Sequence, residues 1–595
     1  MLHEVVLYAR QQCPQSEPGF ASKEVQWAIS LTGDGRLLGV LELGDPGASR
    51  KRGMTFPKAP NLLQPELIGG GKTRSHFLIE TVDVVTGFGE QPERAENNQL
   101  KRDFFLSLLD QASGCVPQLA AASALLRDPD AIGAIRDRLA ELKAKPSDKI
   151  TLCIDGEFPA ASSAWHDWWR RFRAGLNGPS ASGAAMLCLI TGEPVQPAAT
   201  HPKIRGLPGA SPTGASLISF DKDAFQSYGL AQSANAAMSE EVAKAYESGL
   251  DHLIQNSSVR LGDALVVHWF RSKVEADDDP LNWLEDPPGA AEAAAQSRAR
   301  ELLQAIREGR KPDLAGNTFY AFTLSGNAGR AVVRDWMEGA FTELAAAVGQ
   351  WFNDLAIVGL DGALAGPFRF SRLLGSLVRE PRPGEPRQYP PAPLAAKLFR
   401  SAVCAEPIPQ AAFAQALARA RINFLQDQAP SPACMGLIRA FLLRNRNSSK
   451  GGQSMTETIQ PGLNENLASP AYQCGRLMAV LADLQQAALV DVGAGIIQRY
   501  YAAASATPAL VFGRLIRGAQ FHLDKLDRGL ARWYEDRIAD ICTRIGSSMP
   551  ATLTLEEQGL FALGYYQQLA VLRKPKDKLK EANNQEEDIP MEEKQ

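Results

Sequence analysis

The 595-residue sequence lacks any apolar run of about 18 residues, the minimum for a helix that crosses a membrane. Its start, MLHEVVLYARQQCP, lacks the basic and apolar regions of a signal peptide. Its eight cysteines are scattered and form no C-x-x-C pair, which argues against a disulfide framework and a zinc site. These absences predict a cytoplasmic protein with reduced thiols and no membrane partner.

Signatures of catalysis are also scarce. The seven histidines form no H-x-x-x-H motif, and no G-x-S-x-G is present. The segment IGGGKT resembles a P-loop, but Glu66 occupies the position that requires glycine, and the residues after Thr73 are β-rich where a helix should begin. Asp155 and Glu157 give a D-x-E pattern, yet no lysine follows in register and Asp-Gly is a common turn. We therefore expect a binding protein with no cofactor, no metal and no enzymatic activity.

The chain has no excess of positive charge, since its formal net charge is −4. A protein that binds DNA alone is usually basic, so the balance indicates either no nucleic acid or a subunit whose partners supply most phosphate contacts. Cations nevertheless gather early in the chain, at Arg50, Lys51, Arg52, Lys58, Lys72 and Arg74.

The Gly-rich loop that carries Lys72 and Arg74 is a candidate phosphate cradle. Its bare backbone N–H groups, its cations and the hydroxyls of Thr73 and Ser75 can all reach a phosphate oxygen. The alternative is a flexible turn with solvated charges. A second basic loop, HPKIRG followed by LPGASPTGAS, offers four further candidates, Lys203, Arg205, Ser211 and Ser216, with a plain surface loop between strands as the alternative.

The residue pattern predicts an α+β fold with short strands and hairpins, followed by a C-terminal helical bundle. Expected regions are an α/β part with the basic Gly-rich loop at 1–185, a middle α/β part at 186–445, a polar linker at 446–463, the bundle at 464–575 and a disordered tail at 576–595. Hairpins are expected at 25–43 and 319–336, and strands at 76–85, 186–191 and 216–220. Breaks near 493–495, 506–508 and 546–550 divide the bundle.

Four aromatic residues stand at helical spacing in SAWHDWWRRFR: Trp165, Trp168, Trp169 and Phe172. Core packing is the favoured interpretation, and stacking on nucleobases is the alternative.

Short sequence segments that occur in order along the chain resemble the large subunit of the type I-C CRISPR surveillance complex, Cascade. Within 187–246 they are CLITGE, HPKIRG, GASLISF, AFQSYG and SANAAMS. The resemblance continues with FYAFTLSGNAGRAVVRDW at 319–336, YQCGRLMAVLADLQ at 472–485, SATPALVF, and EEQGLFALGYYQQ at 556–568. It therefore covers nearly the whole sequence.

The resemblance implies a non-catalytic subunit of an RNA-guided complex that reads the protospacer-adjacent motif in double-stranded DNA. It also implies help in opening the duplex, R-loop stabilisation and recruitment of a helicase-nuclease. Implied partners are guide CRISPR RNA, the target DNA, the backbone subunits and the small subunit of Cascade. By position, the N-terminal cations are candidates for motif contact and the HPKIRG block for the architecture beside it. Two alternatives stay open: a stand-alone metal- or nucleotide-dependent enzyme with a degenerate motif, and a purely structural assembly subunit.

Met455 is a candidate internal start codon. The preceding Lys450-Gly451-Gly452 can be encoded by a purine-rich ribosome-binding sequence at workable spacing. Type I-C systems, the family resembled, make their small subunit from an internal start within the large-subunit gene. The sequence thus predicts a second product covering residues 455–595, with a plain linker methionine as the alternative.

Overall fold

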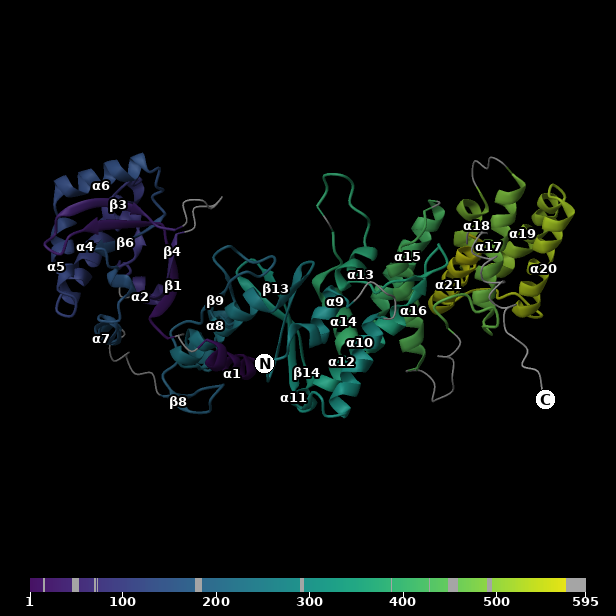
Figure 1. Cartoon of the computed structure of the whole chain (residues 1–595), viewed down its shortest axis with the longest axis horizontal. Helices are drawn as coiled ribbons and strands as arrows, with labels where there is room; N and C mark the ends of the chain where they lie inside the picture. The colour runs from purple at the N-terminus through teal and green to yellow at the C-terminus, as the bar shows by residue number, and fades with distance from the viewer. Residues whose placement is uncertain are drawn as a thin grey trace, which may run out of the picture. The chain divides into compact units, whose positions relative to one another are not determined.

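The chain folds as two compact α+β units, which Figure 1 shows with their labelled elements. Unit 1 comprises Met1–Ile204 and Ser216–His252, and unit 2 comprises Arg205–Ala215 and Leu253–Gln595. The computed structural model describes residues 1–13, 17–44, 53–68, 71, 73–176, 185–288, 294–386, 388–426, 428–447, 459–489 and 495–573. Over these ranges, every helix is too short or too polar to cross a membrane. The predicted fold class is confirmed.

A four-stranded sheet forms the centre of unit 1, in the order β3 (Leu37–Glu42), β2 (Trp27–Leu31), β6 (Lys149–Ile154) and β5 (Glu80–Thr81). β2 and β6 run parallel, and the other pairs are antiparallel. Every residue of β2 is buried, and four of its five residues are apolar, the exception being Ser30. The core that the sheet shares includes side chains of α4 (Ala95–Ala112), α5 (Gln118–Leu125) and α6 (Pro129–Glu141).

The predicted hairpin at 25–43 is confirmed by the antiparallel pairing of β2 with β3. The strand predicted at 76–85 is wrong except for β5, because Val82–Thr86 forms the short helix α3. Val82, Val84 and Val85 are buried in this helix, and Gly87 ends it with a positive φ of 69°. Tertiary burial of the valines here outweighs their β propensity.

A two-stranded ribbon stands beside this sheet in unit 1. β1 (Phe20–Val25) pairs antiparallel with β4 (Met54–Pro60), and the register shifts between Ala21 and Lys23. Trp165, directly before helix α7 (His166–Leu176), and Trp169 within it pack into the core, where both side chains are 0% exposed. The core interpretation of these aromatic residues is therefore confirmed, and base stacking by Trp165 and Trp169 is excluded in this conformation.

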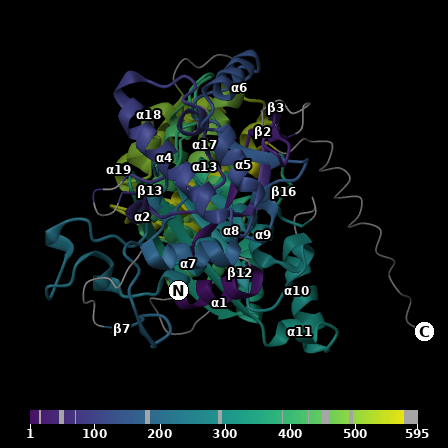
Figure 2. The ribbon, with the colours of Figure 1, turned by 90° about the vertical axis from the view of Figure 1, so that its left-hand side faces the viewer.

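Long loops dominate the rest of unit 1, as Figure 2 shows around β7. The strands predicted at 186–191 and 216–220 are wrong in length, because β7 is only Met186–Leu187 and β10 only Ala215–Ser216. Leu187 and Leu189 are 67% and 65% exposed, so this apolar run has no core to join. The remaining short strands are β8 (Pro194–Val195) and β9 (Lys203–Ile204). Helix α1 (Leu2–Gln12) packs on the part of α8 (Glu240–Asn256) that belongs to unit 1, where Tyr8 Oη lies 2.8 Å from His252 Nδ1.

The main sheet of unit 2 contains four consecutive antiparallel strands, β11 (Ser258–Leu261), β12 (Ala264–Phe270), β13 (Thr318–Asn327) and β14 (Arg330–Ala340). The predicted hairpin at 319–336 is confirmed by the pairing of Asn327 with Arg330. One face of the sheet shares a core with helices that include α9 (Pro280–Glu285), α10 (Ala294–Arg307), α12 (Phe341–Leu355), α13 (Phe370–Ser376) and α14 (Ala392–Val403). Short elements complete this part, α11 (Pro312–Ala315), β15 (Ile357–Val358) and β16 (Leu364–Ala365).

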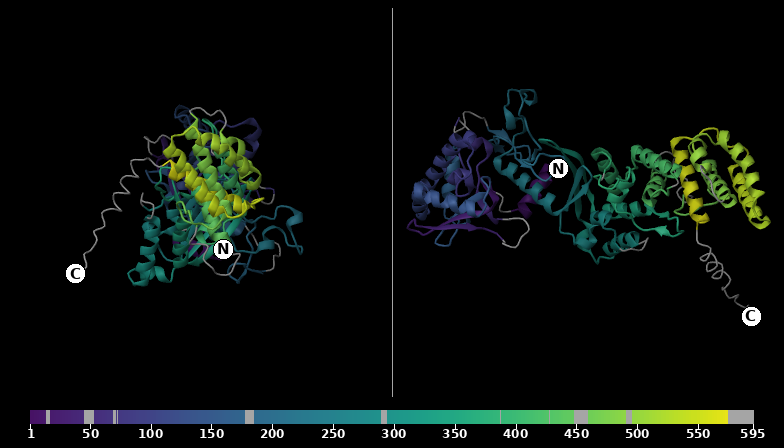
Figure 3. Two further views of the ribbon diagram at one scale, coloured as in Figure 1. Left: turned by 90° about the vertical axis from the view of Figure 1, so that its right-hand side faces the viewer. Right: turned by 90° about the horizontal axis from the view of Figure 1, so that it is seen from above.

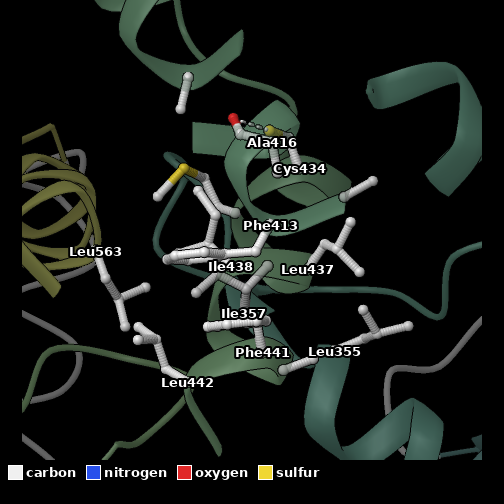
Figure 4. Packing of buried hydrophobic residues seen from close by; sticks show 14 of the residues in the cluster. Leu355, Ile357, Phe413, Ala416, Cys434, Leu437, Ile438, Phe441, Leu442 and Leu563 are labelled. Atoms are coloured by element: carbon white, nitrogen blue, oxygen red, sulfur yellow. Dashed lines mark hydrogen bonds between the residues drawn. The ribbon is translucent and has the colours of Figure 1, made fainter. Parts of the chain in front are cut away.

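Figure 3 shows the helices at the C-terminal end of unit 2, and their buried side chains belong to that same core. They are α15 (Gln410–Leu425), α16 (Pro432–Asn447), α17 (Pro470–Ala488), α18 (Ile496–Ala504), α19 (Pro508–Leu523), α20 (Arg528–Ile545) and α21 (Leu555–Leu572). Phe413 of α15 stacks on Phe441 of α16 with ring centroids 3.9 Å apart, and Leu563 of α21 lies in the same cluster (Figure 4). The predicted breaks at 506–508 and 546–550 are confirmed.

Candidate nucleic-acid interface

The first candidate loop follows helix α2 (Gln64–Ile68). Arg74 turns back onto this helix, since its backbone N–H donates to Leu67 O at 2.9 Å and its Nη1 donates to Glu66 O at 2.5 Å. No helix follows Thr73, which agrees with the rejection of a P-loop. Arg74 therefore closes the Gly-rich loop, and part of its hydrogen-bonding capacity is already used inside the protein.

Ser75 does not fit the predicted set of phosphate-contacting residues in the Gly-rich loop. Its side chain is 1% exposed, so its hydroxyl does not reach the surface to meet a phosphate. Thr73 is half-buried. Lys72 lies outside the described residues, as do Arg50, Lys51 and Arg52.

A buried ionic network lies beneath this loop. Arg173 of α7 donates from Nε to Glu66 Oε1 at 3.0 Å, and its Nη2 lies 2.7 Å from the same oxygen. Arg173 Nη2 also donates to Glu240 Oε1 of α8 at 2.6 Å, while Glu66 Oε2 accepts from the N–H of Leu63 at 2.7 Å. The side chains of Arg173 and Glu66 are only 8% and 5% exposed. The network thus joins three helices of unit 1 and fixes the base of the loop.

Glycine is required beside this network. Gly19 has φ +84°, and a side chain there would collide with the Arg173 guanidinium. Its carbonyl accepts from Trp169 Nε1 at 2.8 Å. The close approach of backbone to Arg173 therefore depends on Gly19.

Lys58 lies on β4 within a cluster of paired charges. Its Nζ is 2.9 Å from Glu17 Oε2 and 4.9 Å from the ring centre of Phe20. Arg170 donates to Glu17 as well, at 2.6 Å, and this hydrogen bond, with help from Lys58 and against partial burial, lowers the pKa of Glu17 to about 2. Glu17 therefore stays ionised and compensates much of the charge that Lys58 would offer to a phosphate.

The second candidate loop is joined to the β13–β14 hairpin through its backbone. Gly326 N–H donates to Pro208 O at 2.7 Å, Ala328 N–H to Gly209 O at 3.0 Å, and Ser211 N–H to Ala328 O at 2.8 Å. Gly209 has φ +75° and its Cα lies against the Gly326 carbonyl, so only glycine fits there. Two Gly-rich segments that are far apart in sequence, LPGASPTGAS and SGNAG, are thereby held together.

This arrangement leaves several polar side chains of the second loop accessible. Arg205 is exposed, Ser211 is partly exposed, and the Ser211 and Thr213 hydroxyls are 3.0 Å apart. Lys203, on β9 of unit 1, is exposed, and Ser216 is half-buried. Because the loop satisfies its backbone groups internally, its side chains are free to meet a ligand without refolding the loop.

Helices α18 and α19 carry a basic surface that was not predicted from the sequence. Residues 496–523 contain three arginines, one histidine and no acidic residue, although the whole chain carries net charge −4. Arg499, Arg514 and Arg517 are all exposed, and the Arg514 guanidinium lies 5.8 Å from the ring centre of Tyr500. Leu510 and Phe521 on α19 are 81% and 70% exposed. A window count of charge finds this segment, which is typical of surfaces that bind single strands.

The D-x-E pattern forms a turn. Asp155 has φ +50°, its Oδ1 accepts from the N–H of Gly33 at 2.9 Å, and Ile154 bridges Glu157. Across the described ranges, no group of three or more histidine, cysteine, aspartate or glutamate side chains is placed to hold a metal ion. Met455, the candidate internal start, lies outside these ranges.

Comparison with known proteins identifies the family. Residues 5–573 match the family described as CRISPR-associated protein (Cas_Csd1). No individual curated protein matches the chain. Since the match covers nearly the whole sequence, the chain belongs to the Csd1 family of CRISPR-associated proteins, the large subunits of type I-C Cascade.

Proposed function

We propose that the chain is a non-catalytic subunit that recognises the protospacer-adjacent motif in double-stranded DNA, aids duplex opening and recruits the helicase-nuclease. The observation that carries this proposal is the pair of Gly-rich segments held together by backbone hydrogen bonds, which presents Arg205, Ser211 and Thr213 on a fixed frame. Short motifs require few base contacts, because guide RNA pairing reads the remaining sequence. A rigid loop that presents few polar side chains, in a chain with a mildly acidic net charge, is consistent with a protein that makes only a few base contacts.

The basic surface of α18 and α19 supports a second part of the proposal, R-loop stabilisation. Its arginines bind phosphates, and Phe521 offers a ring on which a base stacks. We expect it to hold a single DNA strand once the duplex has opened.

The test uses the complex assembled with guide RNA and the backbone subunits. The double variant Lys203→Ala/Arg205→Ala and the single variant Lys72→Ala are compared by gel shift on duplexes with an intact or scrambled motif. Each lost contact weakens binding of the intact-motif duplex by about 1–3 kcal/mol. Arg310→Ala is the matched control, because Arg310 is exposed in unit 2 but pairs with Glu308 at 2.7 Å. Unchanged affinity and motif preference in both test variants would refute motif reading by these loops.

The acidic net charge has a further consequence for binding. The isolated chain binds DNA poorly, because counterion release is limited to local patches. Nanomolar motif-specific binding by the purified chain at physiological salt would contradict this. The same purified chain tests the absence of catalysis, and we expect no hydrolysis of ATP or DNA with Mg²⁺ or Mn²⁺.

A product that begins at Met455 would act as the small subunit. In the full chain, Phe424 of α15 packs on Tyr501 and Tyr565 with centroid distances of 5.0 and 4.6 Å, and Gly559 of α21 lies against Phe413. A shorter product lacks α15 and α16, so these apolar surfaces of α18 and α21 require a new cover. We expect the product to be stable only inside the complex.

The internal start is tested with a C-terminal tag. Blotting of the tagged gene product shows a second band near the mass of residues 455–595, and synonymous recoding of Lys450 to Gly452 removes it. A single full-length band that recoding leaves unchanged would refute the internal start.

A further inference from the structure

One aromatic side chain in the loops of unit 1 stands fully in solvent. Tyr228 is 99% exposed, more than any other described large apolar residue. It lies in a tight loop with Gly229, and both residues adopt left-handed backbone conformations, with φ +54° and +71°. Gln232, four residues later, also has a positive φ of 43°. Non-glycine residues rarely adopt this conformation, so the fold maintains two unfavourable positions to form this loop.

Asn235 holds the loop in place. Its Oδ1 accepts from the N–H of Ser227 at 2.8 Å. Its Nδ2 donates to Leu230 O at 2.8 Å and to Gln232 O at 3.0 Å. One side chain therefore ties together both ends of the loop, and Tyr228 projects from a preorganised support rather than from a free coil.

The Tyr228 loop shares its base with the segment that carries Lys203. His201 donates from Nε2 to Ala236 O at 3.1 Å, which leaves Nδ1 to accept from the Tyr246 hydroxyl at 3.1 Å. Ser233 Oγ donates to Ala199 O at 3.1 Å. His201 is 8% exposed, and burial lowers its pKa, so this anchor stays neutral. The exposed cation Lys203 follows His201 by two residues, and the aromatic loop precedes Ala236.

The composition of the loop favours a nucleobase as the occupant over a protein pocket. Residues 224–239 contain no charged side chain, so nothing in this segment repels a phosphate backbone. Ser227 and Gly229, which flank Tyr228, are small and leave the ring faces open. Gln232 is exposed, and its carboxamide is of the type that hydrogen-bonds to base edges, whereas Gln226 Nε2 already donates to Phe220 O at 3.3 Å. A protein-docking aromatic is typically surrounded by further apolar contacts, whereas the two residues that flank Tyr228 directly are a serine and a glycine, and the nearest exposed large apolar side chain in the sequence is Phe225.

We propose that Tyr228 stacks on an unpaired nucleobase of a DNA strand whose phosphate backbone Lys203 contacts. This inference rests on the proposed function, because it assumes that unit 1 meets DNA during motif reading or duplex opening. The ring supplies the interaction, so phenylalanine replaces tyrosine without loss, and alanine does not.

The experiment uses the assembled complex and motif-bearing duplexes with 2-aminopurine at successive positions beside the motif. In the wild-type complex, one position shows less fluorescence than its neighbours, because stacking on an aromatic ring quenches the base. Tyr228→Ala restores the signal at that position and weakens binding by about 5- to 150-fold, which corresponds to the loss of one base–aromatic stack. Tyr228→Phe behaves as wild type. Leu189→Ala, which removes another highly exposed apolar side chain of unit 1, is the matched control and changes neither readout.

Two outcomes in the assembled complex overturn the inference. Tyr228→Ala with wild-type affinity and fluorescence excludes stacking, and a changed subunit composition in that variant assigns the ring to a protein contact. Failure of the proposed function looks different, since the wild-type complex would then bind intact-motif and scrambled duplexes equally. In that case the same fluorescence comparison on single-stranded DNA tests the stacking alone, and equal signals from the wild type and Tyr228→Ala overturn it.

Discussion

Replacing Arg173 with methionine removes the cation that two carboxylates share beneath the Gly-rich loop. Glu66 would lose this ion pair at a site where its side chain is only 5% exposed. Removing one partner of a buried ion pair costs about 3–5 kcal/mol, because the remaining charge is neither solvated nor paired. We expect the loss to appear locally, in α2 and residues 73–77, since Glu66 O and Leu67 O also hold Arg74.

Hydrogen exchange of the full chain, followed by mass spectrometry, measures this effect. A loss of about 3 kcal/mol raises the exchange of amides in peptides covering residues 62–77 by roughly 100-fold. Arg170→Met is the matched control on the same helix, because the Arg170 side chain is 43% exposed in its pair with Glu17. Exposed ion pairs contribute about 0–1 kcal/mol, so exchange in this control changes by a few-fold at most. Equal exchange in both variants would refute the claim that the buried network fixes the loop. The double variant Arg173→Met/Glu66→Leu, which leaves no unpaired carboxylate at Glu66, should recover part of the loss.

Two further predictions concern stability. Burial lowers the pKa of Lys23 from 10.5 to about 7, so the unfolded chain binds more protons between these values and stability rises with pH across that window. Lys23→Met should flatten that rise, which between pH 7 and pH 9 is worth at most about 3 kcal/mol in urea melts; an unchanged difference between the two pH values would contradict the assignment. Gly475→Ala forces a methyl group into the Phe561 carbonyl of α21 and should destabilise the α17–α21 pair by about 3 kcal/mol in thermal melts. Gly513→Ala, which meets open space on α19, should instead stabilise by about 0.5–1 kcal/mol, and equal effects of the two substitutions would argue against close helix packing.

Elements with strong local signals were predictable from the sequence. Gly33 and Gly35 mark the turn between β2 and β3, and SGNAG marks the turn between β13 and β14, where the pairing closes at Asn327 and Arg330. Pro508 and Gly546 mark helix ends in the same way. In each case one residue restricts or frees the backbone, so the signal depends little on the rest of the fold.

Elements that depend on tertiary contacts were predicted poorly. The valines at 82–85 favour a strand, but they form a short buried helix. The apolar run at 186–191 also reads as a strand, yet Leu187 and Leu189 are exposed and only two residues pair. Apolar residues show that a segment is able to pack in a core, whereas period and propensity cannot show whether the fold provides a surface for it or which one.

For the candidate site, the sequence shows which residue types are present but not which side chains already make contacts within the protein. The sequence-based prediction selected lysines, arginines and serines near glycine, and in the structure Arg205 is exposed, Ser211 is partly exposed and Lys203 is exposed on β9. It could not show that Ser75 is buried or that Arg74 holds the end of α2, because both facts depend on Glu66 and its distant partner Arg173, 107 residues away.

Tyr228 illustrates the same limit from the opposite side. In the sequence it is an ordinary tyrosine in a polar loop, and only the hydrogen bonds of Asn235 reveal that the ring is held outward. A cation whose charge is neutralised by a neighbour is a weak candidate for DNA contact, and an exposed aromatic side chain on a rigid loop is a strong one. The physical criterion for a contact residue is therefore a side chain that is exposed and not already paired within the protein, rather than residue type alone. By this criterion Lys203, Arg205 and Tyr228 are better candidates than Lys58, Arg74 and Ser75.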